Sequence, residues 1–436
     1  QAAKKHYITE PLLMIMMSCL PSSRLNLYSA CNVTNMLACV MVICTLIGVA
    51  ASTSTSPSDD EGFATLVAWM KLHGGRVDSR IDVATNGNGI RGVVALSAIE
   101  EGTELLFCPW ELVIGSTGMQ DQMQKGDGMC SVVKQMAQQI RLKSQSLWHP
   151  YFNHIELPRL AATWEPSALA ELQGLPPTQD ADRHVRWFHQ RCDGGDILDA
   201  AAMRSLVSFI SRASEVGMVP IYDLLNHHNG KRNAKLTLTD EGVTLITVGD
   251  GHIIQRGQEI YLSYGIKTAS TIYRDYGFVE EWPTCWNFKD AASGDNFAFV
   301  VFPHGVVAIN PSAEYLKYIW QTTNLSPEEF EAGAMRHTES LAVGDLERFA
   351  QAVRDHLEDF PSTLGEDELI LEGYRKVLLA EEQAALLVSS DSSNVEDIIS
   401  AISYRIEFKT ALTSSLIYAE SMMASKIRQN VGSHEL

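Results

Sequence analysis

The sequence predicts an α+β fold, and three observations support that class. Short runs typical of β-strands lie at 92–96 and 103–107, joined by a turn that contains Gly102. A long, mainly helical stretch follows from about 115 to 203, and helical spacing of apolar residues returns from about 311. The 436 residues are enough for two to three domains with an ample buried core.

The first globular element is expected just after Gly62. Residues 63–70 (FATLVAWM) have helical apolar spacing, and Gly74 and Gly75 supply a stop. The β-type runs begin inside a glycine-rich segment, 87–95 (GNGIRGVVA). Glycines let backbone amides approach a ligand closely, although such a segment on its own is typical of a surface hairpin turn.

The helical stretches carry large aromatic residues and cap signals. Trp148, Tyr151 and Trp164 are expected to supply core area, as large aromatics mostly do. Near the C-terminus, helices are predicted at 313–320, at 326–330 with Ser326 as a cap, and at 394–417.

The charge balance narrows the classes of partner. A net charge of −19 argues against a nucleic-acid binder, because such proteins usually present a basic face to phosphates. A basic peptide or protein is easier to accommodate. Acidic side chains in the C-terminal helices could contact such a substrate, although a charge run is more often a solvated face.

The 8 cysteines are scattered. None form the close pairs with matching downstream ligands that a structural zinc site requires. We therefore expect reduced thiols and no disulfide framework. Four lie in the first 60 residues, and the globular part holds the other four, Cys108, Cys130, Cys192 and Cys285.

The first 60 residues differ from the rest of the chain. Residues 36–51 form an uncharged apolar run that is shorter than the roughly 20 residues of a membrane span. The run suits a signal-peptide hydrophobic region with cleavage near Ala51, which predicts the secretory route or an organelle, a plastid included. There are two alternatives. The run is retained as a membrane anchor, or it has no targeting role and the protein is in the cytoplasm or nucleus. Met36 is a candidate initiator.

Three further segments follow in order: 219–227 (VPIYDLLNH), 262–265 (LSYG) and 275–278 (DYGF). Together they resemble the C-terminal half of a SET domain. The segment from Gly87 to Pro109 is similar to the first SET motif, and 146–172 resembles the insertion that splits the domain in relatives of the Rubisco large-subunit methyltransferase. Residues 360–369 and 402–409 resemble the substrate-binding helical domain that follows SET in that subfamily.

The resemblance implies a domain plan and an activity. It implies a tail at 1–60, a SET domain at 61–290 with a helical insertion at about 115–205, and an all-α domain at 291–436. The implied activity is methyl transfer from S-adenosyl-L-methionine (SAM) to a lysine of a non-histone protein. Zinc is not expected, because the cysteine-rich cluster of histone-type enzymes is missing after Phe278.

Two alternatives stay open within this fold. One branch of the subfamily modifies a histidine, and a SET fold can also serve as a non-catalytic protein-binding module. A Rossmann-type methyltransferase of small molecules is disfavoured, because the chain lacks the usual strand and glycine-rich turn near its N-terminus.

The resemblance also assigns site residues. Tyr264 is the implied catalytic residue, and Tyr222, Ser214 and Phe278 are the implied substrate channel. Asp223 either contacts the cofactor or orders its loop. The implied cofactor-binding residues are Gly87, Gly89, Glu104, Leu105, Arg212, Asp223, Asn226, His227 and Tyr276.

These residue types suit the implied reaction. A guanidinium matches the carboxylate of SAM, and Asn and His supply fixed donors and acceptors. In methyl transfer the lone pair of the nucleophile must point at the methyl group, so a fixed phenol can orient the amine. An apolar channel beside a sulfonium lowers the pKa of a lysine amine, so no dedicated base is required.

Overall fold

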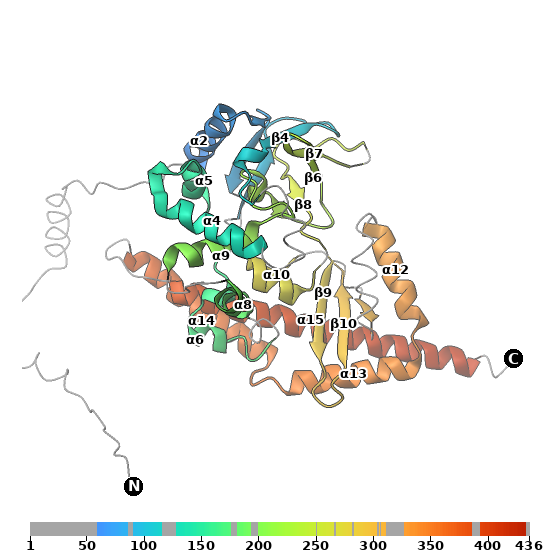
Figure 1. Ribbon diagram of the computed structural model, residues 1–436. Helices are drawn as coiled ribbons and strands as arrows, with labels where there is room; N and C mark the ends of the chain where they lie inside the picture. The colour runs from blue at the N-terminus through green and yellow to red at the C-terminus, as the bar shows by residue number, and fades with distance from the viewer. Residues whose placement is uncertain are drawn as a thin grey trace, which may run out of the picture. The chain divides into compact units, whose positions relative to one another are not determined.

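The computed structural model describes residues 59–85, 90–115, 128–175, 181–192, 199–249, 251–265, 267–280, 283–302, 305, 307–310, 327–385 and 393–432. The predicted targeting segment and the helix expected at 313–320 lie outside these residues. Helices dominate, with several small sheets between them (Figure 1), and the predicted α+β class is confirmed.

The first sheet has four antiparallel strands in the order β1-β4-β7-β6. Helix α2 (Asp59–Leu72) packs against this region through Phe63, Leu66 and Met70, which share one face at helical spacing and are buried. The strand bounds are β1 Arg76–Val77, β4 Glu104–Pro109, β6 Ala234–Leu238 and β7 Gly242–Thr247.

Two further strand pairs lie near this sheet. Strands β2 (Ile81–Thr85) and β3 (Arg91–Ala95) form an antiparallel hairpin. Strands β5 (Asn226–His227) and β8 (Tyr261–Leu262) pair in parallel. The parallel pair brings together two sequence segments that are more than thirty residues apart.

The helical insertion lies between β4 and β5. Helix α9 packs against both α4 and α8, and α4 also contacts α5. Asp199 caps the N-terminus of α9 by accepting hydrogen bonds from the amides of Ala201 and Ala202. The bounds are α4 Gly128–Leu142, α5 His149–His154, α6 Pro166–Ala170, α8 Arg183–Arg191 and α9 Ala200–Arg212.

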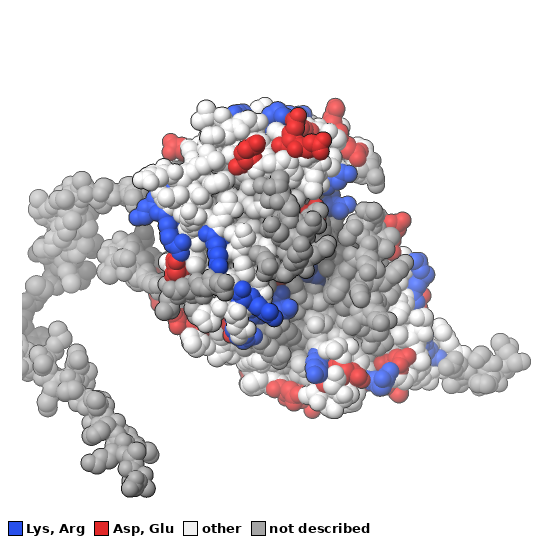
Figure 2. All heavy atoms as spheres, in the orientation of Figure 1, with Lys and Arg blue, Asp and Glu red and all other residues white. Residues whose placement is uncertain are grey.

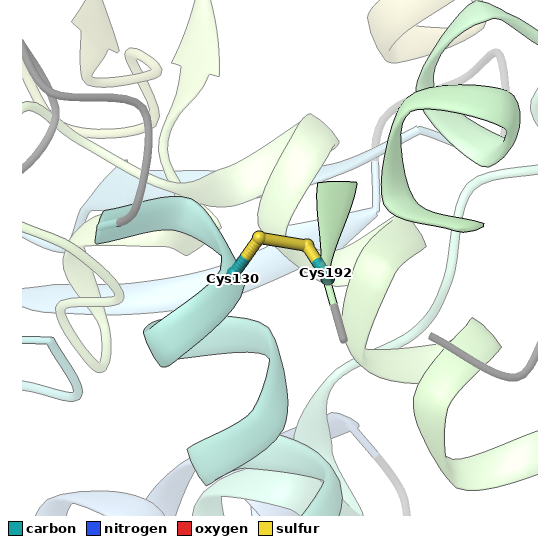
Figure 3. Close-up of a disulfide and its surroundings, with 2 residues drawn as sticks. All are labelled: Cys130 and Cys192. Atoms are coloured by element: carbon teal, nitrogen blue, oxygen red, sulfur yellow. A yellow bond between two sulfur atoms is a disulfide. The ribbon is translucent and has the colours of Figure 1, made fainter. Parts of the chain in front are cut away.

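A disulfide within the insertion corrects the expectation of reduced thiols. Cys130 of α4 and Cys192, which follows α8, are bonded (Figure 3), while Cys108 and Cys285 are free and buried. The two partners are 62 residues apart in sequence and meet because α4 and α8 pack against the same helix, which no local cysteine spacing reveals. Such bonds persist in oxidising compartments, while the secretory or organelle location stays a prediction.

The C-terminal part contains helices and a second sheet. Its three antiparallel strands follow the order β11-β10-β9, with bounds β9 Thr284–Lys289, β10 Asn296–Val301 and β11 Val307–Asn310. The expectation that 291–436 is all-α is therefore wrong, because this range contains the strands β10 and β11. The helices are α10 Ala269–Tyr276, α12 Pro327–Ser340, α13 Val343–Glu358, α14 Leu364–Ala385 and α15 Ser393–Gly432.

A second apolar core holds this part together. Phe288 and Phe299 of the second sheet pack against Phe349 of α13 and, with α15, bury a cluster separate from that of the first sheet. Figure 1 shows α13 and α15 beside β9 and β10. The carboxylate of Asp367 on α14 binds Arg405 at 2.8 Å and Lys409 at 2.6 Å, which links α14 to α15 inside the protein. Among the described residues no helix is both long and apolar enough to cross a bilayer.

Candidate active site

Two neighbouring cavities, of about 410 and 610 Å³, share the wall residues Ser211, Arg212, Asp223, Tyr264 and Tyr276. The rest of the first cavity is formed by Ile90, Arg91, Glu156, Pro158, Leu224, Asn226, His227, His228, Lys231, Glu259, Tyr261, Phe278, Val279 and Glu280. The rest of the second is formed by Ala213, Ser214, Glu215, Tyr222, Arg232, Ala234, Lys235, Leu236, Leu262, Ser263, Gly265 and Lys267.

Tyr264, in the shared wall, is fixed by the segment that contains β5. The parallel pairing of β5 with β8 sets His227 beside Leu262, two residues before Tyr264. The Tyr264 amide donates to His227 Nδ1 at 2.9 Å, its hydroxyl donates to the Leu225 carbonyl at 2.7 Å, and its ring stacks on the imidazole with centroids 4.9 Å apart. These contacts hold the phenol in one orientation.

The same hydrogen bond fixes the proton of His227. Because Nδ1 accepts from the Tyr264 amide, the neutral imidazole carries its proton on Nε2. Nε2 lies 3.2 Å from Glu280 Oε2, although the angle is too poor for a hydrogen bond. Glu280 also accepts from the amide of Asn229 at 2.8 Å, so this buried carboxylate anchors the segment that follows β5.

The end of α10 supplies Tyr276 and Phe278. Thr268 caps the start of this helix, and Gly277 ends it in the left-handed region with φ of 82°, a conformation that glycine adopts without strain. The turn places the Tyr276 ring 4.8 Å from that of Tyr264 and the Phe278 ring 6.2 Å from the His227 ring. Aromatic side chains therefore line one side of the shared wall.

Arg212 and Asp223 form the polar part of the shared wall. Arg212, the last residue of α9, donates to the backbone carbonyls of Asp223, at 2.8 Å, and of Glu156. The Asp223 carboxylate accepts from the Tyr151 hydroxyl at 2.8 Å. Burial raises the pKa of Asp223, and the nearby Arg212 guanidinium and Tyr151 hydroxyl offset this only in part.

Among the described residues, two buried atoms of this pair have no hydrogen-bond partner, Arg212 Nε and Asp223 Oδ1. An unsatisfied buried polar atom costs about 1–3 kcal/mol. Both atoms are shielded from the cavities, and the Asp223 side chain is fully buried, so they mark a polar pair within the wall and not positions open to a ligand. The expected guanidinium fork is partly occupied, because both terminal nitrogens already bind carbonyls.

Asn226 binds the hairpin strand β3 across the first cavity. Its Nδ2 donates to the Arg91 carbonyl at 2.9 Å and to Glu259 Oε1 at 2.6 Å. This approach requires glycine at position 92, since a Cβ there would lie 2.2 Å from Glu259 Oε1 and 2.7 Å from Asn226 Nδ2.

Burial shifts the pKa of several titratable side chains that line the two cavities. It raises the pKa of the Tyr222 and Tyr264 hydroxyls, and it raises the pKa of Tyr276 to about 12. These phenols stay protonated at neutral pH, so they donate hydrogen bonds and do not act as bases. Burial also lowers the pKa of the Lys267 ammonium, which Asp275 opposes.

The structure brings most of the sequence-predicted site residues together. Arg212, Asp223, Asn226, His227, Tyr264 and Tyr276 line the first cavity, and Tyr222 and Ser214 line the second. Phe278, predicted for the substrate channel, lines the first cavity instead.

The residues predicted from the first SET motif are not placed at either cavity. Glu104, at the start of β4, binds Arg76 at 2.7 and 3.0 Å near the surface, and Leu105 is fully buried in the first core. Neither lines the two cavities. Gly87 and Gly89 lie outside the described residues.

The sequence reasoning missed three contributors. Glu280 lies two residues beyond the DYGF segment, beside a second glutamate in the sequence, and only the structure shows that it is buried. The Tyr151 hydroxyl and Gly92 act across long sequence separations. Tyr151 was expected only as a core aromatic, and Gly92 lies in the glycine-rich segment 87–95 without a separate role of its own. Among the described residues no group of His, Cys, Asp or Glu could hold a metal ion.

Comparison with known proteins identifies the fold family of this chain. No protein-family model and no curated protein matches the sequence. Among solved structures, the SET domain of LSMT bound to lysine and AdoHcy is 17% identical with a TM-score of 0.52, covering 84% of this chain and 92% of that one. Rubisco LSMT bound to AdoMet is 16% identical with a TM-score of 0.52, covering 83% of this chain and 92% of that one. The chain therefore has the SET-domain fold of the Rubisco LSMT type, as the sequence predicted.

Proposed function

We propose that this chain is a SAM-dependent protein-lysine N-methyltransferase that acts on a non-histone protein. A fold alone does not determine an activity, so the proposal depends on the site. Its main support is the pair of cavities that meet at a fixed Tyr264, one able to hold a cofactor and the other an acceptor side chain.

The first cavity suits SAM by size and charge. Its volume of about 410 Å³ falls in the usual range for small-molecule sites. Its lining has three basic and four acidic side chains, a net charge of −1, and SAM is a net cation because it carries a sulfonium besides its ammonium and carboxylate. The basic set is Arg91, Arg212 and Lys231, and the acidic set is Glu156, Asp223, Glu259 and Glu280.

Particular residues would hold the cofactor. Arg212 and Asp223 lie in the wall of this cavity, where their charges complement the carboxylate and the ammonium of SAM. Asn226 and His227 border the same cavity. The similar solved structures are complexes with AdoMet, AdoHcy or sinefungin, which supports the same cofactor class here. When bound, SAM supplies an electrophilic methyl group.

The second cavity suits an uncharged amine. The positive charges of Lys267 and Arg212 in its lining disfavour the charged form of a substrate lysine. The pKa of an entering lysine would therefore fall, and its amine would lose the proton more readily. The protonated phenols of Tyr222, Tyr264 and Tyr276 can surround and orient that amine. Lysine is proposed as the acceptor because similar structures hold lysine or its methylated forms.

The test is radiolabelled methyl transfer by the full chain into a cell lysate, followed by mass-spectrometric mapping of the modified residues. We expect label on lysine. Label on histidine would show that the acceptor is histidine and not lysine. No label from a folded sample would favour a non-catalytic binding module.

A variant pair locates the chemistry. Tyr264→Phe should keep SAM affinity within about twofold and lower turnover on the order of 100-fold, because the fixed oxygen that accepts an N–H of the amine and orients its lone pair is lost. Tyr273→Phe is the matched control, since its hydroxyl binds Ser400 at 2.8 Å in the second core and lines neither cavity. Full turnover in Tyr264→Phe would remove the role assigned to this residue.

A further inference from the structure

The second cavity differs in charge from the chain as a whole. Its lining contains four basic side chains against two acidic ones, a net charge of +2 within a chain of −19. The basic set is Arg212, Arg232, Lys235 and Lys267, and the acidic set is Glu215 and Asp223. On the face drawn in Figure 2, basic and acidic side chains lie in small groups, with uncharged surface between many of them.

The basic residues divide into two groups by depth. Arg212 is mostly buried and lies 4.0 Å from the Asp223 carboxylate, so these two largely balance each other in the shared wall. Lys267 is partly buried beside Asp275. Arg232 and Lys235 are exposed. Among the described residues, neither of these two side chains forms an ion pair.

Strand β6 explains why Lys235 reaches the cavity from outside. The strand is at an edge of the first sheet, next to β7 only. Ala234 is buried and Lys235 is exposed, as the alternation of a strand requires. Arg232 precedes the strand, so the two cations flank the second cavity on its solvent side, with Glu215 as the exposed acidic residue nearby.

We infer that this rim selects acceptor lysines flanked by aspartate or glutamate, and this inference rests on the proposed function. A cationic lining helps the amine become neutral, but it also repels basic residues beside the acceptor. Carboxylates next to the acceptor would meet Arg232 and Lys235, which have no ion-pair partner in the described structure. This reverses the expectation, drawn from net charge, that a basic partner is easier to accommodate.

The expected size of the preference is moderate. Exposed ion pairs typically change an equilibrium by about 1.5- to 5-fold each, and charge complementarity also raises association rates. Two carboxylates should together raise kcat/KM by about 5- to 20-fold over a matched basic sequence. Because the groups are exposed, the preference should shrink as salt rises.

The experiment uses the full chain with radiolabelled SAM and lysine-centred peptide libraries that carry acidic, neutral or basic flanks. The flanks of lysines labelled in a lysate are mapped in parallel. We expect enrichment of acidic flanks in both sets. Methylation with no flank preference, or with a basic one, overturns the inference and leaves the proposed function intact. No methylation of peptides or lysate removes the proposed function, and the inference with it.

Charge reversal tests the named residues. The double variant Arg232→Glu and Lys235→Glu should invert the preference toward basic flanks while SAM affinity is unchanged. Lys289→Glu is the control, because Lys289 is exposed on β9 and lines neither cavity. An unchanged preference in the double variant would contradict the assignment to this rim.

Discussion

The two cavities share a wall but differ in charge and construction. The first has a net lining charge of −1 and is organised by partly buried hydrogen bonds of Asn226, His227 and Arg212. The second has a net charge of +2 and a rim of exposed side chains. Under the proposed function, this difference means that the first cavity would hold one fixed cationic ligand and the second a neutral group carried on a variable partner.

Arg212→Ala is the strongest way to break this separation, because Arg212 belongs to both cavities. The substitution leaves two carbonyls without their donor and the buried Asp223 without its nearby cation. Removing one partner of a buried pair costs about 3–5 kcal/mol. We expect a large loss of stability in denaturant unfolding, and losses of SAM affinity and turnover of about 100-fold or more.

A matched arginine controls for this effect. Arg204 is also on α9 and donates to the Phe152 carbonyl at 2.6 Å, but it lines neither cavity. Arg204→Ala should retain SAM binding. Normal binding and turnover in folded Arg212→Ala protein would show that the shared wall is not functional.

The disulfide should affect stability without affecting either cavity. Replacing both Cys130 and Cys192 by serine opens a loop spanning 62 residues, which typically costs about 2–4 kcal/mol. Thermal unfolding should detect the loss, and calorimetry should find SAM affinity unchanged within about twofold. A large loss of SAM binding would mean that the insertion supports the cofactor cavity directly.

Acid should weaken the helix that carries Tyr276. Burial opposes ionisation of Asp275, but hydrogen bonds from His184 and Arg274 outweigh it and lower its pKa to about 2. Because the ionised form is favoured in the folded state, this stabilisation is complete above about pH 4 and is lost as the pH falls toward 2. Unfolding free energy should fall by about 2 kcal/mol over that range. Asp275→Asn should remove most of this dependence of the unfolding free energy on pH. If the free energy still fell as steeply between about pH 4 and 2 in this variant, the assignment to Asp275 would be wrong.

Gly92→Ala should disturb only the first cavity, and its effect should be the smallest of the changes considered. The added Cβ displaces Glu259 and Asn226, so we expect about a tenfold loss of SAM affinity measured by calorimetry. Gly373→Ala on α14 is the control, because a Cβ there meets nothing within 4 Å. Equal SAM affinity in both variants would show that the contact of Asn226 with β3 is dispensable.

Contiguous motifs predicted which residues lie together, while their roles stay a prediction. Arg212, Asn226, His227, Tyr264 and Tyr276 come from short segments whose order resembles a SET domain, and all five line the first cavity. The local turn chemistry that places them, such as Gly277 after α10, is also visible in the sequence.

Features that depend on distant parts of the chain were not predictable in this way. Leu105 was predicted to bind the cofactor, but its side chain is buried in the first core. Residues 105–109 of β4 are all buried, because this strand lies inside the first sheet between β1 and β7. The bond between Cys130 and Cys192 depends on how helices pack, and strands β10 and β11 gain stability from pairing and from α13 and α15. Sequence spacing carries no information about such contacts.

The central claim, that the first cavity holds SAM and the second does not, is tested most directly by calorimetric titration of SAM into the full chain. We predict one bound SAM per chain, loss of binding in Asn226→Ala, and unchanged binding in Lys235→Glu. Absence of SAM binding to folded wild-type protein, or equal weakening by both substitutions, would contradict the claim.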